Sequence, residues 1–132
     1  MNVLLDTNAL LRTVLEPQRL SRRARQTISR ASVQGGLSIA SITIWEIAQL
    51  VERRRLPVQG TTSDFLAELL AETGVMVLEL TPTIAELSTA FGADFPHDPA
   101  DRIIAATARA HALPLVTADE RIRKTQLLKT IW

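Results

Sequence analysis

The chain has 132 residues, which suits one compact domain spanning 1–132, and its 46% hydrophobic content is enough for a buried core. A net charge of +1 argues against a strongly basic nucleic-acid binder, and the absence of cysteine excludes disulfides, thiolate zinc sites and cysteine nucleophiles. No apolar run approaches the ~20 residues of a membrane span and the amino terminus does not resemble a secretory signal, so we expect no membrane partner and a cytoplasmic location.

The first half of the chain predicts two short buried strands, each followed by helices. Both strands are apolar runs, the second directly after a Gly-Gly break, and the helices show apolar residues at helical spacing. In chain order the predicted elements are a strand at 2–5, a helix starting near Thr7, a helix at 20–33, a strand at 37–40, and helices at 41–55 and 62–73.

The second half continues this alternation. Thr81 and Asp98 each precede a proline, a pairing typical of a helix N-cap followed by the first helical residue. The predicted elements are a strand at 75–80, a helix from 82, a helix from 99 to 111 and a strand at 113–116. Strands alternating with helices predict an α/β fold with a central, mainly parallel sheet flanked by helices.

Two acids follow apolar strands directly. Asp6 ends the first strand and Asp119 follows the last, and ligands of open α/β sheets bind at such strand-to-helix turns. Asp6 could instead simply cap the next helix. For Asp119 we expect a capping box formed by Thr117 and Glu120, which would leave Asp119 free to face outward.

Glu46 is the only charged residue between 37 and 51. A lone carboxylate in so apolar a helix needs water, a partner or a metal, because leaving it unpaired costs several kcal/mol. The alternative is a capping box between Thr43 and Glu46, although Ser41 is an equally good cap and gives a longer helix.

Asp98 and Asp101 lie together in the segment HDPADR. With Asp98 as N-cap, Asp101 occupies the third helical position, where the helix dipole favours an acid. Both therefore have a possible structural role. We select Asp101 as the functional acid, because Asp98 already serves as the cap.

One parallel sheet could gather Asp6, Glu46, Asp101 and Asp119 at a single edge. Carboxylates so close together repel one another and raise each other's pKa. A hard divalent cation such as Mg²⁺ or Mn²⁺, which prefers oxygen ligands, would relieve this repulsion.

Four segments of the sequence resemble the PIN-domain ribonucleases, and among them the VapC-like toxins of type II toxin–antitoxin pairs. The segments are LLDTNALLR at 4–12, ASITIWEIAQL at 40–50, DPADRIIAATA at 98–108 and LPLVTADERI at 113–122, and their order matches along essentially the whole chain. The resemblance implies a PIN fold with an acidic pocket at the carboxyl edge of its sheet. Ala100 departs from the family, where a bulky aromatic is common at this position, so the resemblance does not determine the shape of the groove.

The resemblance also implies roles for individual residues. Catalytic and metal-binding acids fall on the four selected above, and supporting polar residues fall on Asn8 and Thr117. The implied reaction is hydrolysis of an RNA phosphodiester by water activated by one or two Mg²⁺ or Mn²⁺ ions. The implied partners are an RNA substrate, an antitoxin whose tail fills the acidic groove, and a second copy of the chain.

Arginine outnumbers lysine among the basic residues, since only two of the 15 are lysines, which leaves 13 arginines. Arginine clusters provide candidate RNA contacts at Arg22, Arg23, Arg53 and Arg54. Solvated helix faces and a genome-wide codon bias toward arginine are the alternative explanations.

Other functions fit the sequence less well. His97 and His111 flank one predicted helix and would lie roughly 20 Å apart, too far for two-histidine catalysis. A response-regulator receiver would need a late lysine in a different context from Lys124 and Lys129. The main alternative is a non-catalytic PIN-fold module that acts through a protein partner.

Overall fold

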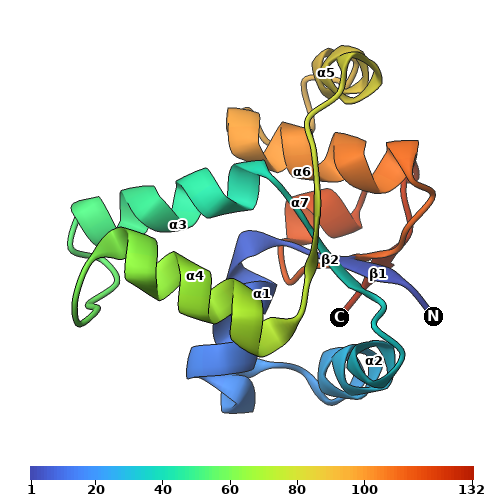
Figure 1. The fold of residues 1–132 in the computed structure, drawn as a ribbon. Coiled ribbons are helices and arrows are strands. Elements are labelled where there is room, and N and C mark those ends of the chain that lie inside the picture. Colours follow the sequence, from blue (N-terminus) through green and yellow to red (C-terminus); the bar gives the residue numbers. More distant parts are fainter.

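A five-stranded parallel sheet lies at the centre of the computed structural model, which describes residues 1–132 (Figure 1). Its strands are β1 (Val3–Leu5), β2 (Leu37–Ala40), β3 (Met76–Leu78), β4 (Leu115–Val116) and β5 (Thr130–Ile131). They lie in the order β3-β2-β1-β4-β5, and every neighbouring pair is parallel. The predicted α/β fold with a mainly parallel sheet is therefore confirmed.

Seven α-helices and one 3₁₀ turn surround the sheet. They are α1 (Thr7–Leu15), η1 (Pro17–Arg19), α2 (Arg22–Val33), α3 (Ile42–Glu52), α4 (Thr62–Thr73), α5 (Pro82–Thr89), α6 (Pro99–Ala110) and α7 (Glu120–Arg123). Thr81 and Asp98 cap α5 and α6 through their side chains and a proline follows each, as predicted. None of the helices combines the length and the apolar character needed to cross a bilayer.

Both faces of the sheet are covered, which explains why its strands are continuous apolar runs. Every residue of β1 is buried, and successive side chains enter different cores because strand side chains alternate between faces. Val3 and Leu5 join the core shared with α1, α2 and α4, whereas Leu4 joins the core shared with α5 and α6. In Figure 1, α5, α6 and α7 accordingly lie on one side of the sheet and α1, α2 and α4 on the other.

The register brings three central strands to an end at the same level. Leu5 is paired with Ile39 of β2 on one side and with Val116 of β4 on the other. The residues that follow these strands therefore meet at one edge of the sheet. This edge is where the sequence places Asp6, and where Thr117 continues the chain toward Asp119.

Two predictions of secondary structure were wrong. The helix expected over 41–55 ends at Glu52, because Arg54 adopts a left-handed backbone conformation with a φ of 56° that an α-helix cannot contain. The strand β5 was not predicted at all. It has only two residues and pairs with the equally short β4, so no run of alternating or apolar residues marks it.

Candidate active site

Asp6 is both the cap of a helix and part of a cavity. Its carboxylate accepts a hydrogen bond of 2.7 Å from the backbone N–H of Ala9, so the capping role considered from the sequence is real. Because Asp6 directly follows β1, the cap also holds the carboxylate at the carboxyl edge of the sheet. Together with the hydrogen bond from Thr117, this contact still leaves acceptor capacity on the Asp6 carboxylate.

Glu46 reaches from α3 to the first residue of α1. Its carboxylate accepts a hydrogen bond from the hydroxyl of Thr7, 39 positions earlier in the sequence. No capping box forms with Thr43, and Ser41 occupies the N-cap position of α3 without a capping side-chain hydrogen bond. The Thr7 hydroxyl thus provides the polar partner that a half-buried carboxylate needs in this apolar helix.

Asp98 and Asp101 begin α6 at the same edge. The Asp98 carboxylate accepts a hydrogen bond of 2.8 Å from the N–H of Ala100, which confirms it as the N-cap. Asp101 lies in the first turn and makes no side-chain hydrogen bond that would commit its carboxylate elsewhere. Asp101 therefore retains the free carboxylate expected of a functional acid.

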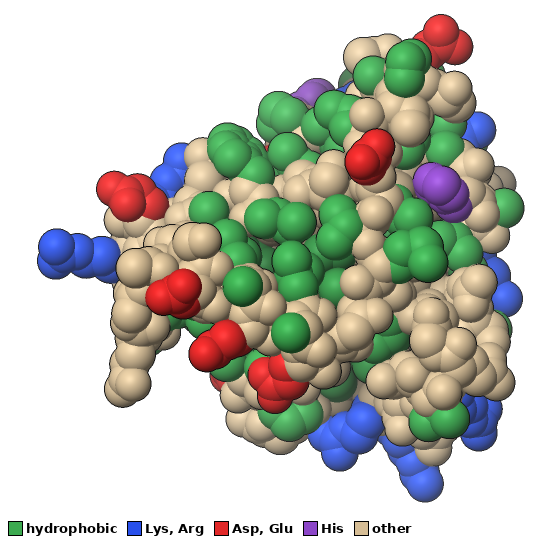
Figure 2. All heavy atoms as spheres, viewed as in Figure 1, with side chains coloured by type: hydrophobic (Ala, Val, Ile, Leu, Met, Phe, Trp, Pro, Cys, Tyr) green, Lys and Arg blue, Asp and Glu red, His purple; other side chains and the backbone are tan.

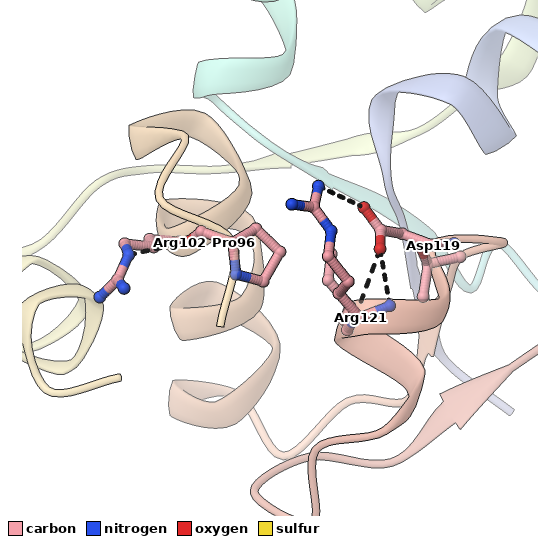
Figure 3. Close-up of polar contacts among 6 residues, drawn as sticks. Pro96, Arg102, Asp119 and Arg121 are labelled. Carbon is pink, nitrogen blue, oxygen red and sulfur yellow. Dashed lines mark hydrogen bonds and ion pairs between the residues drawn. The ribbon is translucent and has the colours of Figure 1, made fainter. Parts of the chain in front are cut away.

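The prediction for the cap of α7 was wrong. Asp119 itself is the N-cap, since its carboxylate accepts hydrogen bonds from the N–H groups of Arg121 at 2.9 Å and Ile122 at 3.4 Å. Thr117 instead accepts a hydrogen bond of 3.1 Å from the N–H of Asp119. The Arg121 guanidinium also folds back to within 3.7 Å of the Asp119 carboxylate (Figure 3). The expectation that Asp119 would be free of local partners was therefore wrong.

Two neighbouring cavities, of about 270 and 260 Å³, bring all four predicted acids together. Asp6, Asn8 and Asp101 line both cavities. Asp119 lines the first and Glu46 the second, so each cavity contains three of the four predicted acids.

Burial and mutual repulsion raise the pKa of three of these carboxyls. Loss of solvent raises the pKa of Asp6, and hydrogen bonds from Thr117 and Ala9 offset part of that rise. Loss of solvent also raises the pKa of Glu46, against the hydrogen bond from Thr7. For Asp101 burial comes first and four neighbouring carboxylates add to it, raising its pKa to about 7. The acids are thus close enough to repel one another.

Some residues of the site were not singled out from the sequence. Asp98 lines the second cavity and adds its charge to that of Glu46 and Asp101, although its sequence context indicated only a cap. Arg12 lines the first cavity and lowers the pKa of Asp6, while its guanidinium lies 5.4 Å from the ring centre of Trp132. The spacing of Asn8 and Arg12, four residues apart and therefore on one helical face, was a usable signal.

The candidate RNA-binding arginines are distributed unevenly. Arg53 lines the second cavity beside Glu46. Arg22 and Arg23 begin α2 and are exposed, and neither lines one of the two acidic cavities. Arg54 is exposed in the turn after α3 and lines neither cavity.

The donor set suits a hard cation, because it consists of carboxylates and amide or hydroxyl oxygens, without sulfur or imidazole. No three acidic or histidine side chains already converge on one metal position, however. The carboxylates of Asp6, Glu46 and Asp119 each accept a hydrogen bond from a backbone N–H or a hydroxyl of the protein instead. Three or more of these carboxylates could therefore ligate one ion only after side-chain rotation.

Comparisons with known proteins agree with this architecture. A PIN domain family profile matches residues 3–127. The chain is 37% identical over 132 residues to Ribonuclease VapC22 of Mycobacterium tuberculosis, covering 98% of both chains. Among solved structures, FitAcB from Neisseria gonorrhoeae superposes with a TM-score of 0.69 at 21% identity, covering 97% of this chain and 95% of that one. DNA-bound VapBC from Salmonella typhimurium gives a TM-score of 0.70 at 19% identity, with 98% and 96% covered. The chain therefore belongs to the PIN-domain family.

Proposed function

We propose that this protein is a divalent-metal-dependent endoribonuclease. The observation that carries the proposal is the gathering of Asp6, Glu46, Asp101 and Asp119 around two adjoining cavities at the carboxyl edge of the sheet. Full-length similarity to Ribonuclease VapC22 supports RNA as the substrate.

The four acids would hold one or two Mg²⁺ or Mn²⁺ ions, with Asp6 and Asp101 central because they line both cavities. A bound ion would lower the pKa of a water molecule and neutralise charge that develops on the phosphoryl oxygens. Asn8 and Thr117 would support the site, Asn8 from the shared lining and Thr117 through its hydrogen bonding to Asp6. One carboxylate would accept the proton of the attacking water, and the products would carry a 5′-phosphate and a 3′-hydroxyl.

Positive side chains beside the acids would receive the RNA backbone. Arg53 is the best supported of the four arginines expected from the sequence, because it lines the acidic cavity. Arg12 offers a second guanidinium at the other cavity, packed against Trp132. Arg22, Arg23 and Arg54 would contact only more distant parts of a long RNA.

We also propose that the protein is the cytoplasmic toxin of a toxin–antitoxin pair. The similarity to VapC22 and to the VapBC complex of Salmonella typhimurium supports an antitoxin protein as partner. A homodimer is supported by hydrophobic side chains that gather on the face shown in Figure 2, and by Trp45 and Met76, which are 54% and 61% exposed. The carboxyl end contributes less to such an interface than expected, because Ile131 is buried in β5.

The test is cleavage of single-stranded RNA by the purified protein with Mn²⁺, with Mg²⁺ and with excess EDTA. We expect cleavage with metal that EDTA abolishes and added Mn²⁺ restores. Cleavage that continues in EDTA would exclude the metal-dependent mechanism. A folded protein that binds its antitoxin but cleaves no RNA with either metal would favour the non-catalytic binding module.

A further inference from the structure

A third cavity adjoins the acidic site and has a different chemical character. It measures about 620 Å³ and lies between α7 and the loop that joins α5 to α6. Arg121 of α7 and Lys124, the C-cap of α7, line it on one side, and Phe91, Gly92, Asp94 and Phe95 line it from the loop. Its charged lining is thus two cations and one carboxylate, whereas carboxylates predominate in the cavities beside it.

Arg121 links this cavity to the acidic site. Its guanidinium lies 3.7 Å from the carboxylate of Asp119, which lines the acidic cavity, and it also lines the third cavity (Figure 3). Asp119 and Lys124 are the N-cap and C-cap of α7, so their backbones are separated by an axial rise of roughly 7 Å. This rise is comparable with the stacked rise of about two nucleotides of one strand.

The loop wall of this cavity is held in place. Arg102 on α6 donates hydrogen bonds from all three guanidinium nitrogens, to the carbonyl oxygens of Pro96 at 2.9 Å, Phe91 at 3.0 Å and Gly92 at 3.1 Å. The rings of Phe91 and Phe95 stack with their centres 4.2 Å apart. A ligand entering this cavity would therefore meet a preformed wall. Less conformational entropy is lost on binding when the loop is already ordered.

We propose that this cavity is a nucleotide subsite, which receives a nucleotide one or two positions from the cleaved bond of single-stranded RNA. Arg121 and Lys124 bind its phosphates, and the volume between α7 and the loop accommodates its sugar and base. The Asp94 carboxylate faces the base as a hydrogen-bond acceptor and favours bases that present an amino group. This inference rests on the proposed ribonuclease function.

The first test measures binding without cleavage. A fluorescent single-stranded RNA is titrated with the full-length protein in EDTA, for wild type, Lys124→Gln and the control Lys129→Gln, at several salt concentrations. Lys129 is also exposed, but it lies outside this cavity. We expect Lys124→Gln to weaken binding by about threefold or more and to lower the salt slope by about 0.7, the value for one phosphate contact on a single strand.

The second test blocks the cavity without changing its charge. A Cβ built on Gly92 meets no atom within 4 Å, so Gly92→Leu adds a side chain to the cavity lining without a clash at Cβ. We expect this variant to lose affinity for RNA with an unchanged salt slope. Equal losses in Lys124→Gln and Lys129→Gln would overturn the proposal as a general charge effect. Unchanged RNA binding in both Lys124→Gln and Gly92→Leu would also overturn it and leave the cavity to a protein partner. These binding measurements need no turnover. A failure of the subsite proposal can therefore be distinguished from a failure of the proposed ribonuclease function, which the cleavage assay measures.

Discussion

The hydroxyl of Thr7, the first residue of α1, donates a hydrogen bond to the carboxylate of Glu46 on α3. The hydroxyl oxygens of Thr7 and Thr43 lie 3.1 Å apart. Because Thr7 has one hydroxyl hydrogen and gives it to Glu46, Thr43 is the donor in that second contact. Two buried hydroxyls thus form a chain that fixes the direction of one carboxylate in the acidic site.

We expect Thr7→Val to impair the site, whereas Thr7→Ser leaves it nearly intact. Valine has the shape of threonine but no donor, and loss of a partner that orients a metal ligand typically costs 10- to 100-fold in metal affinity or activity. The measurement is RNA cleavage as a function of Mn²⁺ concentration for both variants. Equal activities of the valine and serine variants would show that the hydroxyl does not position Glu46.

We expect Asp6→Asn and Asp101→Asn each to lower RNA cleavage by about tenfold or more, because both acids line both acidic cavities. Asp64→Asn is the matched control, since Asp64 is an exposed acid in the first turn of α4. Initial cleavage rates at saturating Mn²⁺ provide the comparison. The assignment of the site would be wrong if both site variants retained wild-type rates.

Three of the four acids could be selected from the sequence because each interrupts or ends an apolar pattern that has a known place in an α/β fold, whereas Asp101 was selected because Asp98 already serves as the cap. Strands followed by acids locate Asp6 and Asp119, and an isolated charge in an apolar helix locates Glu46. The hydrogen-bond partners of these acids could not be predicted from the sequence in the same way. The Thr7–Glu46 contact depends on how α1 packs against α3, and local sequence does not determine that packing.

The N-cap of α7 shows a second limit of prediction from the sequence. Threonine and aspartate are both strong N-cap residues, so Thr117 and Asp119 compete for one position, and the sequence alone favoured the wrong one. Arg12 was missed although its spacing from Asn8 places both residues on one face of α1. Its contact with Trp132 was not predictable, because Trp132 follows a strand of two residues that no sequence pattern marked.

Expression of the wild-type protein alone should slow bacterial growth, and Asp6→Asn at the same protein level should not. Cleavage of cellular RNA would account for the difference, because the variant keeps the fold but loses a central carboxylate of the site. Growth curves with matched immunoblots make the comparison, and co-expression of the cognate antitoxin should restore growth. A harmless wild-type protein that cleaves RNA well in vitro would argue against a toxin but not against a nuclease.

Gly36 is a position where the fold itself should not tolerate a side chain. A Cβ there would lie 2.6 Å from the backbone oxygen of Met1 and 2.7 Å from the side-chain oxygen of Asn2, next to the pairing of β1 with β2. We expect Gly36→Ala to lower the free energy of unfolding by about 1–3 kcal/mol. Gly92→Ala is the control, since its added Cβ meets nothing within 4 Å. Urea denaturation of both variants tests the difference.

The crowding of the acids should make the stability of the metal-free protein depend on pH through Asp101. Its pKa is raised from 3.8 in the unfolded chain to about 7 in the folded protein. The folded state therefore holds an extra proton between these values, and its stability falls as the pH rises from about 4 through 7. Asparagine resembles the protonated acid and carries no charge at any pH.

In EDTA, Asp101→Asn should therefore melt a few degrees above the wild type at pH 8, and this difference should shrink steadily as the pH falls toward 4. Added Mn²⁺ should stabilise the variant less than the wild type, because a ligand that binds only the folded state raises its stability according to its affinity. If Asp101 only complements the dipole of α6, the variant should instead lose about 0.3–1 kcal/mol and keep the full response to Mn²⁺. Asp64→Asn, in the first turn of α4, measures that dipole effect alone. An Asp101→Asn protein that behaves like Asp64→Asn in both buffers would remove Asp101 from the four-acid site.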